Sequence, residues 1–221
     1  HSDLRRQRQM CIRDSWQHAL KTLSGVQCIG LEAAVQMVGF YERAGFQKDC
    51  ITTRRQMLFR SESTLDLSPS QRSDVAVVPL REVSLEAIQR YDERHEISPR
   101  PHFLELWLRH RAGDVFAARD AEGECHGYVR IRPCLLPIGE GWRVGPWLAE
   151  DPGMASLLLN NALDHHNGVV LIDTPGHNPS AKTILSARGF KPMTSTVRMY
   201  KGVIPKGHDR NVYGLACLEL G

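Results

Sequence analysis

The stretch that decides the fold is written twice, as "VQCIGLEAAVQMVGFYERAGF" at residues 26–46 and "VVLIDTPGHNPSAKTILSARGF" at residues 169–190. Each copy runs from an apolar strand through a turn into a helix that ends in Gly-Phe, and the two endings lie 144 positions apart. Gly45 and Gly189 stand where a helix C-terminus favours a left-handed residue, and a phenylalanine follows to pack back on the helix. The repeat predicts two related α/β units in one chain.

The flanks of the two copies also match. Helices are predicted over "SWQHALKTL" (15–23) and "ASLLLNNALDHH" (155–166), and strands over "CITTRRQMLF" (50–59) and "TSTVRMYKG" (194–202). The polar, serine-rich stretch 61–73 reads as a linker. We therefore expect a first unit at 16–60 that has lost its beginning, and a complete second unit at 74–221.

The second unit gives a full order of elements. It begins with a strand (74–80), a helix (85–95) capped by Ser84 and a short helix within 98–110, and continues with a hairpin that turns at Glu122-Gly123. A strand with Pro146 inside it, a helix capped by Asp151, a strand and a helix capped by Asn178 follow. Strands within 195–202 and 211–220 are expected to close this mixed sheet.

Residues 1–15, "HSDLRRQRQMCIRDS", are set aside from fold reasoning. They lack an apolar period and resemble a translated sequencing-adapter read; a genuine basic arm is the alternative. Their four arginines and two aspartates account for two of the three net positive charges, so the rest of the chain predicts no nucleic-acid partner. No run suits a membrane span, and the six scattered cysteines show no metal-ligand spacing. We expect a cytoplasmic protein with free thiols.

Pro146 predicts the place where a ligand enters the sheet. Proline removes a ladder hydrogen bond, so its strand must part from a neighbour. If it parts from the strand at 169–174, the backbones of Trp147, Leu148 and Ala149 face a cleft that can pair with an amide-bearing ligand. The helix start that follows, with Gly153, Met154 and Ala155, leaves room for a diphosphate at its positive end. Plain helix capping is the alternative interpretation.

This order of elements resembles the Gcn5-related N-acetyltransferase (GNAT) superfamily, and specifically the C-terminal half of bacterial tandem members. The resemblance covers 74–221 in full, and "GFYERAGF" in 39–46 is the most specific piece of the first unit. It implies a GNAT-like acyl-CoA N-acyltransferase fold in which an amine attacks the thioester of acetyl-CoA directly. It also implies a tyrosine that protonates the departing thiolate, and Tyr41 occupies that position.

The two copies differ at the positions that the resemblance makes important. Leu185 takes the place of Tyr41 in the second unit and cannot donate a proton. The superfamily's Arg/Gln-x-x-Gly-x-Gly/Ala loop would lie upstream of Trp16 in the first unit, and "EDPGMA" (150–155) puts Glu150 in the Arg/Gln place. Two acids beside a diphosphate are unfavourable. We expect the two units to have divided labour, and this 221-residue chain to be poorly active.

Further candidates have both functional and plain readings. Asp173 and Asn178 can line the cofactor groove, or serve only as a turn residue and a helix cap. Arg130 and Arg132 can hold an acidic acceptor group or face solvent. His95, Arg100 and His102 lie in the connection where the superfamily sets acceptor specificity. Adjacent side chains in "DHH" (164–166) point apart, so no metal is expected.

The sequence therefore predicts an N-acetyltransferase that uses acetyl-CoA, without a metal, on a small-molecule or amino-acid-like amine. The alternative is a degenerate GNAT-fold module that binds acyl-CoA or a metabolite, or supports the first unit, without catalysis. Nothing in the sequence indicates an oligomeric state or a membrane partner.

Overall fold

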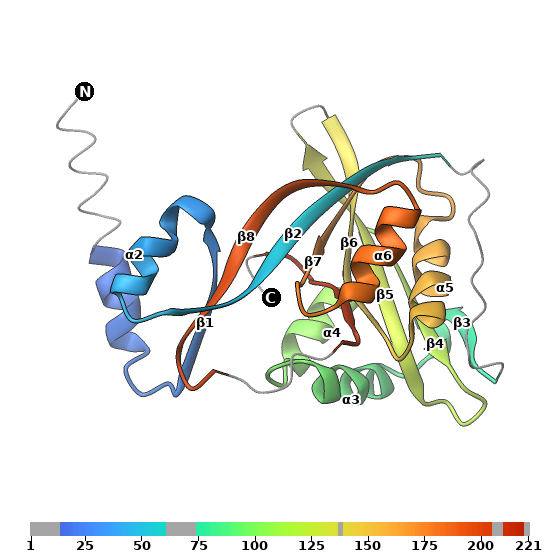
Figure 1. Ribbon diagram of the computed structural model, residues 1–221. Coiled ribbons are helices and arrows are strands. Elements are labelled where there is room, and N and C mark those ends of the chain that lie inside the picture. Colours follow the sequence, from blue (N-terminus) through green and yellow to red (C-terminus); the bar gives the residue numbers. More distant parts are fainter. Residues whose placement is uncertain (1–13, 61–73, 137–138, 205–209, 219–221) are drawn as a thin grey trace.

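Residues 14–60, 74–136, 139–204 and 210–218 are described by the computed structural model, in which one mixed sheet runs through the molecule (Figure 1). Its strand order is β1-β8-β2-β7-β6-β5-β4-β3, with β9 beside β6. The strands are β1 (Cys28–Ala34), β2 (Gln47–Phe59), β3 (Ala76–Pro79), β4 (Asp114–Arg119), β5 (Cys125–Leu136), β6 (Gly139–Ala149), β7 (Gly168–Thr174), β8 (Lys191–Gly202) and β9 (Val212–Gly214).

The helices are α2 (Val38–Arg43), α3 (Leu85–His95), α4 (Pro101–Arg109), α5 (Pro152–Leu163) and α6 (Pro179–Ala187), with a further helix over 14–22 and short 3-10 turns η1 (Val35–Met37) and η2 (Leu80–Glu82). Helices α3, α5 and α6 begin where the sequence places their caps, after Ser84, Asp151 and Asn178. The Ser84 hydroxyl accepts a hydrogen bond from the Ala87 N–H at 3.0 Å, and Asn178 caps α6 at the same distance. Gly45 and Gly189 have φ of 90° and 84°, which confirms both predicted C-terminal glycines.

Helices cover both faces of the β3–β7 part of the sheet. Because successive strand residues point to opposite faces, Tyr128 packs with α3 and α4 while Val129 packs with α5 and α6. The hairpin predicted at Glu122-Gly123 joins β4 to β5, and Gly123 has a φ of 90°. Two apolar layers therefore hold this half of the sheet, and the mixed α/β fold class is confirmed.

The two sequence repeats exchange strands. β8 of the second repeat lies between β1 and β2 of the first, and β2 lies between β8 and β7. Figure 1 shows β2 and β8 as two long strands, side by side, that cross from the lobe of β1 and α2 to the main body. Their antiparallel register pairs Thr52 with Thr196, which are the same position of the repeat. An approximate two-fold axis therefore passes through this pair.

Two details of the sequence-based topology are wrong. The strand 195–202 was expected to close the second unit, yet no pairing joins β8 to β7, because β2 occupies the place between them. The final strand was expected over 211–220, whereas β9 covers Val212–Gly214 and pairs with the end of β6. Strands from both sides of 61–73 share one sheet, and the predicted linker itself lies outside the described residues.

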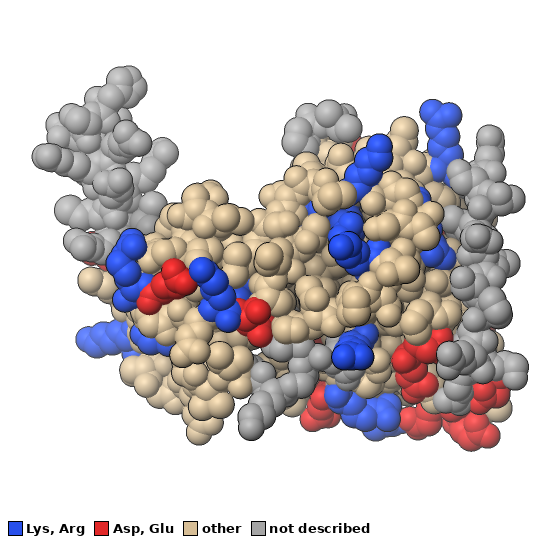
Figure 2. Space-filling view, in the orientation of Figure 1, with Lys and Arg blue, Asp and Glu red and all other residues tan. Residues whose placement is uncertain are grey.

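Charges of both signs are interspersed on the visible face (Figure 2). Basic and acidic side chains alternate over the lobe of β1 and α2, and acidic groups gather at the lower right, where Figure 1 places α3 and the β4–β5 hairpin. Among the described residues, no helix has the length and apolar character needed to cross a membrane.

The strand exchange predicts that the chain cannot be divided into independent units. A fragment that lacks 14–60 leaves β8 without either neighbour and β7 without β2, which exposes long unpaired edges. We expect fragments cut within 61–73 to be insoluble or unfolded alone, and to copurify as a folded pair when they are coexpressed. Circular dichroism and size-exclusion chromatography measure both outcomes. Cooperative thermal unfolding of 74–221 by itself would contradict the exchange.

Candidate functional site

The strands around Pro146 part as the sequence predicts. β6 and β7 pair in parallel over Trp142–Val144 and Val170–Ile172, and this pairing stops just before Pro146. The gap is taken by the chain's own C-terminal segment, because Trp147 pairs with Gly214 and the Ala149 N–H donates to the Asn211 carbonyl at 3.0 Å. On the other side the Leu215 N–H donates to the Asp173 carbonyl at 2.9 Å. The expectation that Trp147, Leu148 and Ala149 offer free backbone groups is therefore wrong.

The start of α5 is also occupied by protein groups. The Asp151 carboxylate accepts from the Met154 N–H at 2.9 Å, and the Glu150 carboxylate lies 2.8 Å from His126 Nδ1. Met154 and Ala155 are buried, and Gly153 is half-buried beside the cap. The groove that the sequence predicts for acyl-CoA is therefore filled by protein groups, since β9 lies beside β6 and the carboxylates of Glu150 and Asp151 lie at the start of α5.

Asn178 and Asp173 have structural partners. The Asn178 side chain caps α6 and donates to the Val212 carbonyl at 3.1 Å, which holds β9 in the gap. Asp173 forms a two-pronged ion pair with Arg54, with N–O distances of 2.7 and 2.9 Å. Asn178 is therefore the helix cap of the plainer interpretation, whereas Asp173 is not a turn residue, because it lies inside β7 as the buried partner of Arg54.

Tyr41 lies in the lobe of the first repeat. Its ring contacts Trp16 at 5.5 Å and Phe46 at 5.9 Å between centroids, and no described residue forms a hydrogen bond with its hydroxyl. The neighbouring strand β1 pairs with β8 alone among the described strands. Leu185, at the same position of the second repeat, is fully buried. The only phenol at this repeat position is therefore in the lobe with an open strand edge.

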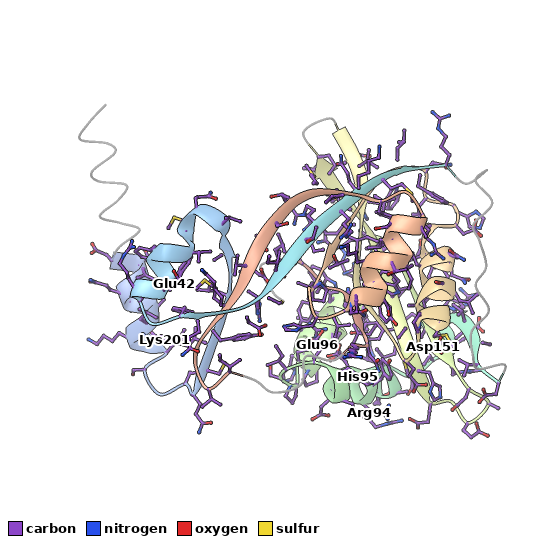
Figure 3. The ribbon with its side chains drawn as sticks, viewed as in Figure 1. Glu42, Arg94, His95, Glu96, Asp151 and Lys201 are labelled. Carbon is purple, nitrogen blue, oxygen red and sulfur yellow. The ribbon has the colours of Figure 1, made fainter. Side chains whose placement is uncertain are left out.

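A pocket lies where the two repeats meet, and we call it the junction pocket. It lies between the β1–β8–β2 strands, the end of α3 and the loop after β7. Its lining consists of Glu32, Cys50, Thr52, His95, Glu96, Ile97, Pro175, His177, Arg198, Tyr200, Val212 and Leu215. Figure 3 shows His95 and Glu96 at the end of α3, between this helix and the crossing strands.

Glu32 is the central acid of the junction pocket. Its side chain is 5% exposed, and its carboxylate accepts from the hydroxyls of Thr52 at 2.9 Å and Thr196 at 2.7 Å. Burial raises the pKa of Glu32, although both hydroxyl donors and Arg198, 3.9 Å away, oppose the rise. One carboxylate thus bridges the two equivalent threonines of the repeat.

A second acid enters from α3. Burial raises the pKa of Glu96 as well, against the attraction of Arg100, whose guanidinium lies 2.7 Å away. The Arg100 guanidinium also donates two hydrogen bonds to the Asp92 carboxylate, with N–O distances of 2.8 and 2.9 Å. The Tyr128 hydroxyl donates to that same carboxylate. Arg100 is therefore paired with protein carboxylates and fixes Glu96, and His95 is among the residues that line the pocket.

Arg130 lies elsewhere, in a second pocket lined by Phe103, Leu106, Trp107, His110, Ala112, Arg130, Arg132 and Pro133. Its guanidinium carbon lies 5.0 Å from the centre of the Trp107 ring, and that of Arg132 lies 4.9 Å from it. Burial, with Arg132 beside it, lowers the pKa of Arg130 to about 10. The three predicted substrate residues are therefore not brought together: His95 and Arg130 line different pockets, and Arg100 lines neither.

Sequence reasoning missed Glu32, Cys50, Thr52, His177, Arg198 and Tyr200. One signal for them existed, because "TTR" at 52–54 and "TVR" at 196–198 stand 144 positions apart and extend the repeat beyond its Gly-Phe endings. Thr52 and Thr196 of these motifs hold Glu32, and Arg198 lies beside it. No comparable signal marks Cys50 or His177.

The raised pKa of Glu32 predicts a pH-dependent stability. The folded state holds this proton more tightly than the unfolded chain, so the contribution is full below the ordinary value of 4.5 and is lost as pH rises through the folded pKa. Glu32→Gln should remove this fall, which denaturant unfolding from pH 4 to pH 7 measures relative to wild type. Thr52→Ser keeps the hydroxyl and should keep the wild-type slope. Identical slopes for wild type and Glu32→Gln would contradict the burial of a titrating carboxyl.

Comparison with known proteins gives the family. A family model described as "Acetyltransferase (GNAT) domain" matches residues 88–214. A holothin acyltransferase from a Pseudoalteromonas strain is 25% identical over 210 residues, which cover 94% of this chain and 65% of the relative. The chain thus spans slightly less than two thirds of that relative's length.

Solved structures agree on the fold. A protein from Pyrococcus horikoshii, described as an acetyltransferase, superposes with a TM-score of 0.72 at 20% identity, over 94% of this chain and 65% of its own. A GCN5-related N-acetyltransferase from Anabaena variabilis gives 0.56 at 15% identity, over 83% and 48%. With more than half of its length matched by the family model, the chain belongs to the GNAT acetyltransferase domain family.

Proposed function

We propose that the protein serves acetyl transfer from acetyl-CoA to a small amine that binds in the junction pocket. The observation that carries the proposal is the pair of buried carboxyl groups, Glu32 and Glu96, in one pocket at the meeting of the repeats. An ammonium group gains an ion pair there that a neutral or anionic ligand does not. The GNAT fold implies an acyl-CoA donor, and the relative named as a holothin acyltransferase supports acyl transfer.

The chemistry assigns two tasks to groups of this chain. An ammonium has no lone pair, so a base must take its proton before nitrogen attacks the thioester carbon, and Glu32 is suited to this because burial makes it a better base. As the C–S bond breaks, the thiolate needs a proton. The Tyr41 hydroxyl is proposed as this proton donor on the family resemblance alone, because Tyr41 packs with Ala33 and Met199 and is not among the residues that line the junction pocket with Glu32. Acetyl-CoA would then lie beside the first repeat, since β9 fills the groove of the second repeat.

A second candidate function concerns residues 74–218, which would support the first repeat without catalysis. Two observations favour it: β9 fills the groove between β6 and β7, and Leu185 replaces the phenol. The two candidates agree on the second repeat and differ on whether the protein acetylates an amine that binds in the junction pocket.

Amine binding tests the acceptor site that the first candidate requires. We expect primary amines to raise the melting temperature in a panel that includes the matching alcohols and carboxylates. Glu32→Gln should abolish the stabilisation, and Glu42→Gln, on the exposed face of α2, should leave it intact. If no amine of a broad panel stabilises the protein, or if Glu32→Gln responds like wild type, the acceptor assignment is wrong.

Removal of the Tyr41 hydroxyl tests its proposed role as the proton donor to the thiolate. Tyr41→Phe should lower kcat by about 10²-fold or more with little change in KM, because general acids typically contribute this much to the rate. Acetylated product should be measured by mass spectrometry, because the chain's own thiols interfere with assays of thiol release. The matched control is Tyr213→Phe, since Tyr213 lies in β9 of the second repeat. An unchanged kcat in Tyr41→Phe would rule out this role.

A further inference from the structure

Three side chains with metal-binding atoms converge on the wall of the junction pocket. The ligand atoms of Asp49, Cys50 and His177 all lie within 4.8 Å of one another, and His177 Nε2 is 2.9 Å from Asp49 Oδ2. Within the described part of the chain, no other group of three or more histidine, cysteine or acidic side chains meets this condition. Cys50 and His177 also line the pocket.

A β-bulge brings the first two ligands together. Neighbouring residues of a regular strand point to opposite faces, so Asp49 and Cys50 would normally diverge. The pairing of β2 with β8 shifts between Lys48 and Ile51, so that both residues stand opposite Arg198 alone. A bulge of this kind redirects side chains, and it is common beside functional sites. The second repeat has Met193 and Thr194 at these positions, so the ligand pair belongs to the first repeat alone.

Gly176 brings the third ligand. A Cβ at this position would lie 2.7 Å from the Ile51 carbonyl oxygen and 3.4 Å from Cys50 Cβ. Only glycine allows the loop after β7 to approach the bulge so closely, and His177 follows directly. The three ligands therefore come from segments about 127 residues apart, held together by two local backbone features.

The ligand types select the metal. Thiolate with imidazole and carboxylate suits Zn²⁺ and its spectroscopic substitute Co²⁺, whereas Mg²⁺ and Ca²⁺ take oxygen ligands. At metal–ligand distances of about 2.0–2.3 Å, tetrahedral ligand atoms lie roughly 3.5 Å apart. Side-chain shifts of about 1 Å close the present arrangement to that spacing. Three protein ligands leave a fourth position, as in zinc sites that bind substrate or water.

The charged side chains around the three ligands favour a bound cation. Glu32 and Glu96 line the same pocket and attract a cation, while Arg198 opposes it but lies 3.9 Å from the Glu32 carboxylate. The fourth position faces the pocket, because Cys50 and His177 contribute to its lining. We propose that Asp49, Cys50 and His177 form a zinc-type site whose open coordination position faces the junction pocket.

Cobalt titration of the whole chain tests the site. Co²⁺ bound by a thiolate produces a sulfur-to-metal charge-transfer band in the near ultraviolet, and we expect it to saturate at one ion per chain. Cys50→Ser should abolish the band, and His177→Asn should weaken Co²⁺ binding at least tenfold. Cys134→Ser, at a half-buried thiol of β5 outside the pocket, should behave as wild type. Circular dichroism confirms that each variant is folded.

The outcomes are distinct from those of the acyl-transfer experiments. Absence of a charge-transfer band in wild type, or its persistence in folded Cys50→Ser, would overturn the metal site. Zn²⁺ should displace the bound Co²⁺ and bleach the band, and failure to do so would count against a zinc-type site. Amine binding through Glu32 does not involve these ligands, so either proposal can fail without the other.

Discussion

The pairing of β2 with β8 is the interaction on which the rest of the structure depends. These two strands are the same element of two repeats, and they meet in register at Thr52 and Thr196. Each lies between strands of the other repeat, so the main sheet is continuous only through them. Glu32 accepts a hydrogen bond from both threonines and ties the outer strand β1 to the same centre. Burial of that carboxylate is tolerable because hydroxyl donors and Arg198 meet it.

The exchange also forms the junction pocket. A pocket that forms where β1, β8 and β2 cross takes groups from both repeats, and α3 adds Glu96 under the control of Arg100. Meanwhile the gap between β6 and β7 is closed in the second repeat, since β9 pairs with Trp147 and Leu148. The second repeat therefore contributes lining residues and charged side chains to the junction pocket, and the Tyr41 phenol lies in the lobe of the first repeat.

Much of the fold could be read from the sequence because its signals are local. Caps at Ser84, Asp151 and Asn178, glycines at helix ends and the turn at Gly123 act within a few residues of themselves. Strand exchange could not be read in this way, since no local signal in the sequence says which distant strand pairs with β8, and the pairing with β2 is decided by packing in space. The residues of the site were the part that the sequence predicted least. Cys50 and His177 meet through a bulge and a glycine contact, which leave no fixed spacing in the sequence. Pro146 was correctly interpreted as the point of divergence, yet the occupant of the gap comes from 65 or more residues further along the chain.

Amide hydrogen exchange, resolved by strand under native conditions, tests the interlocked sheet most directly. If β2 and β8 join the two repeats, their amides should exchange only through global unfolding, with the same free energy of opening as those of β5, β6 and β7. The account would be contradicted if β1 and β2 opened as a separate unit at a much lower free energy while β5 to β8 stayed protected.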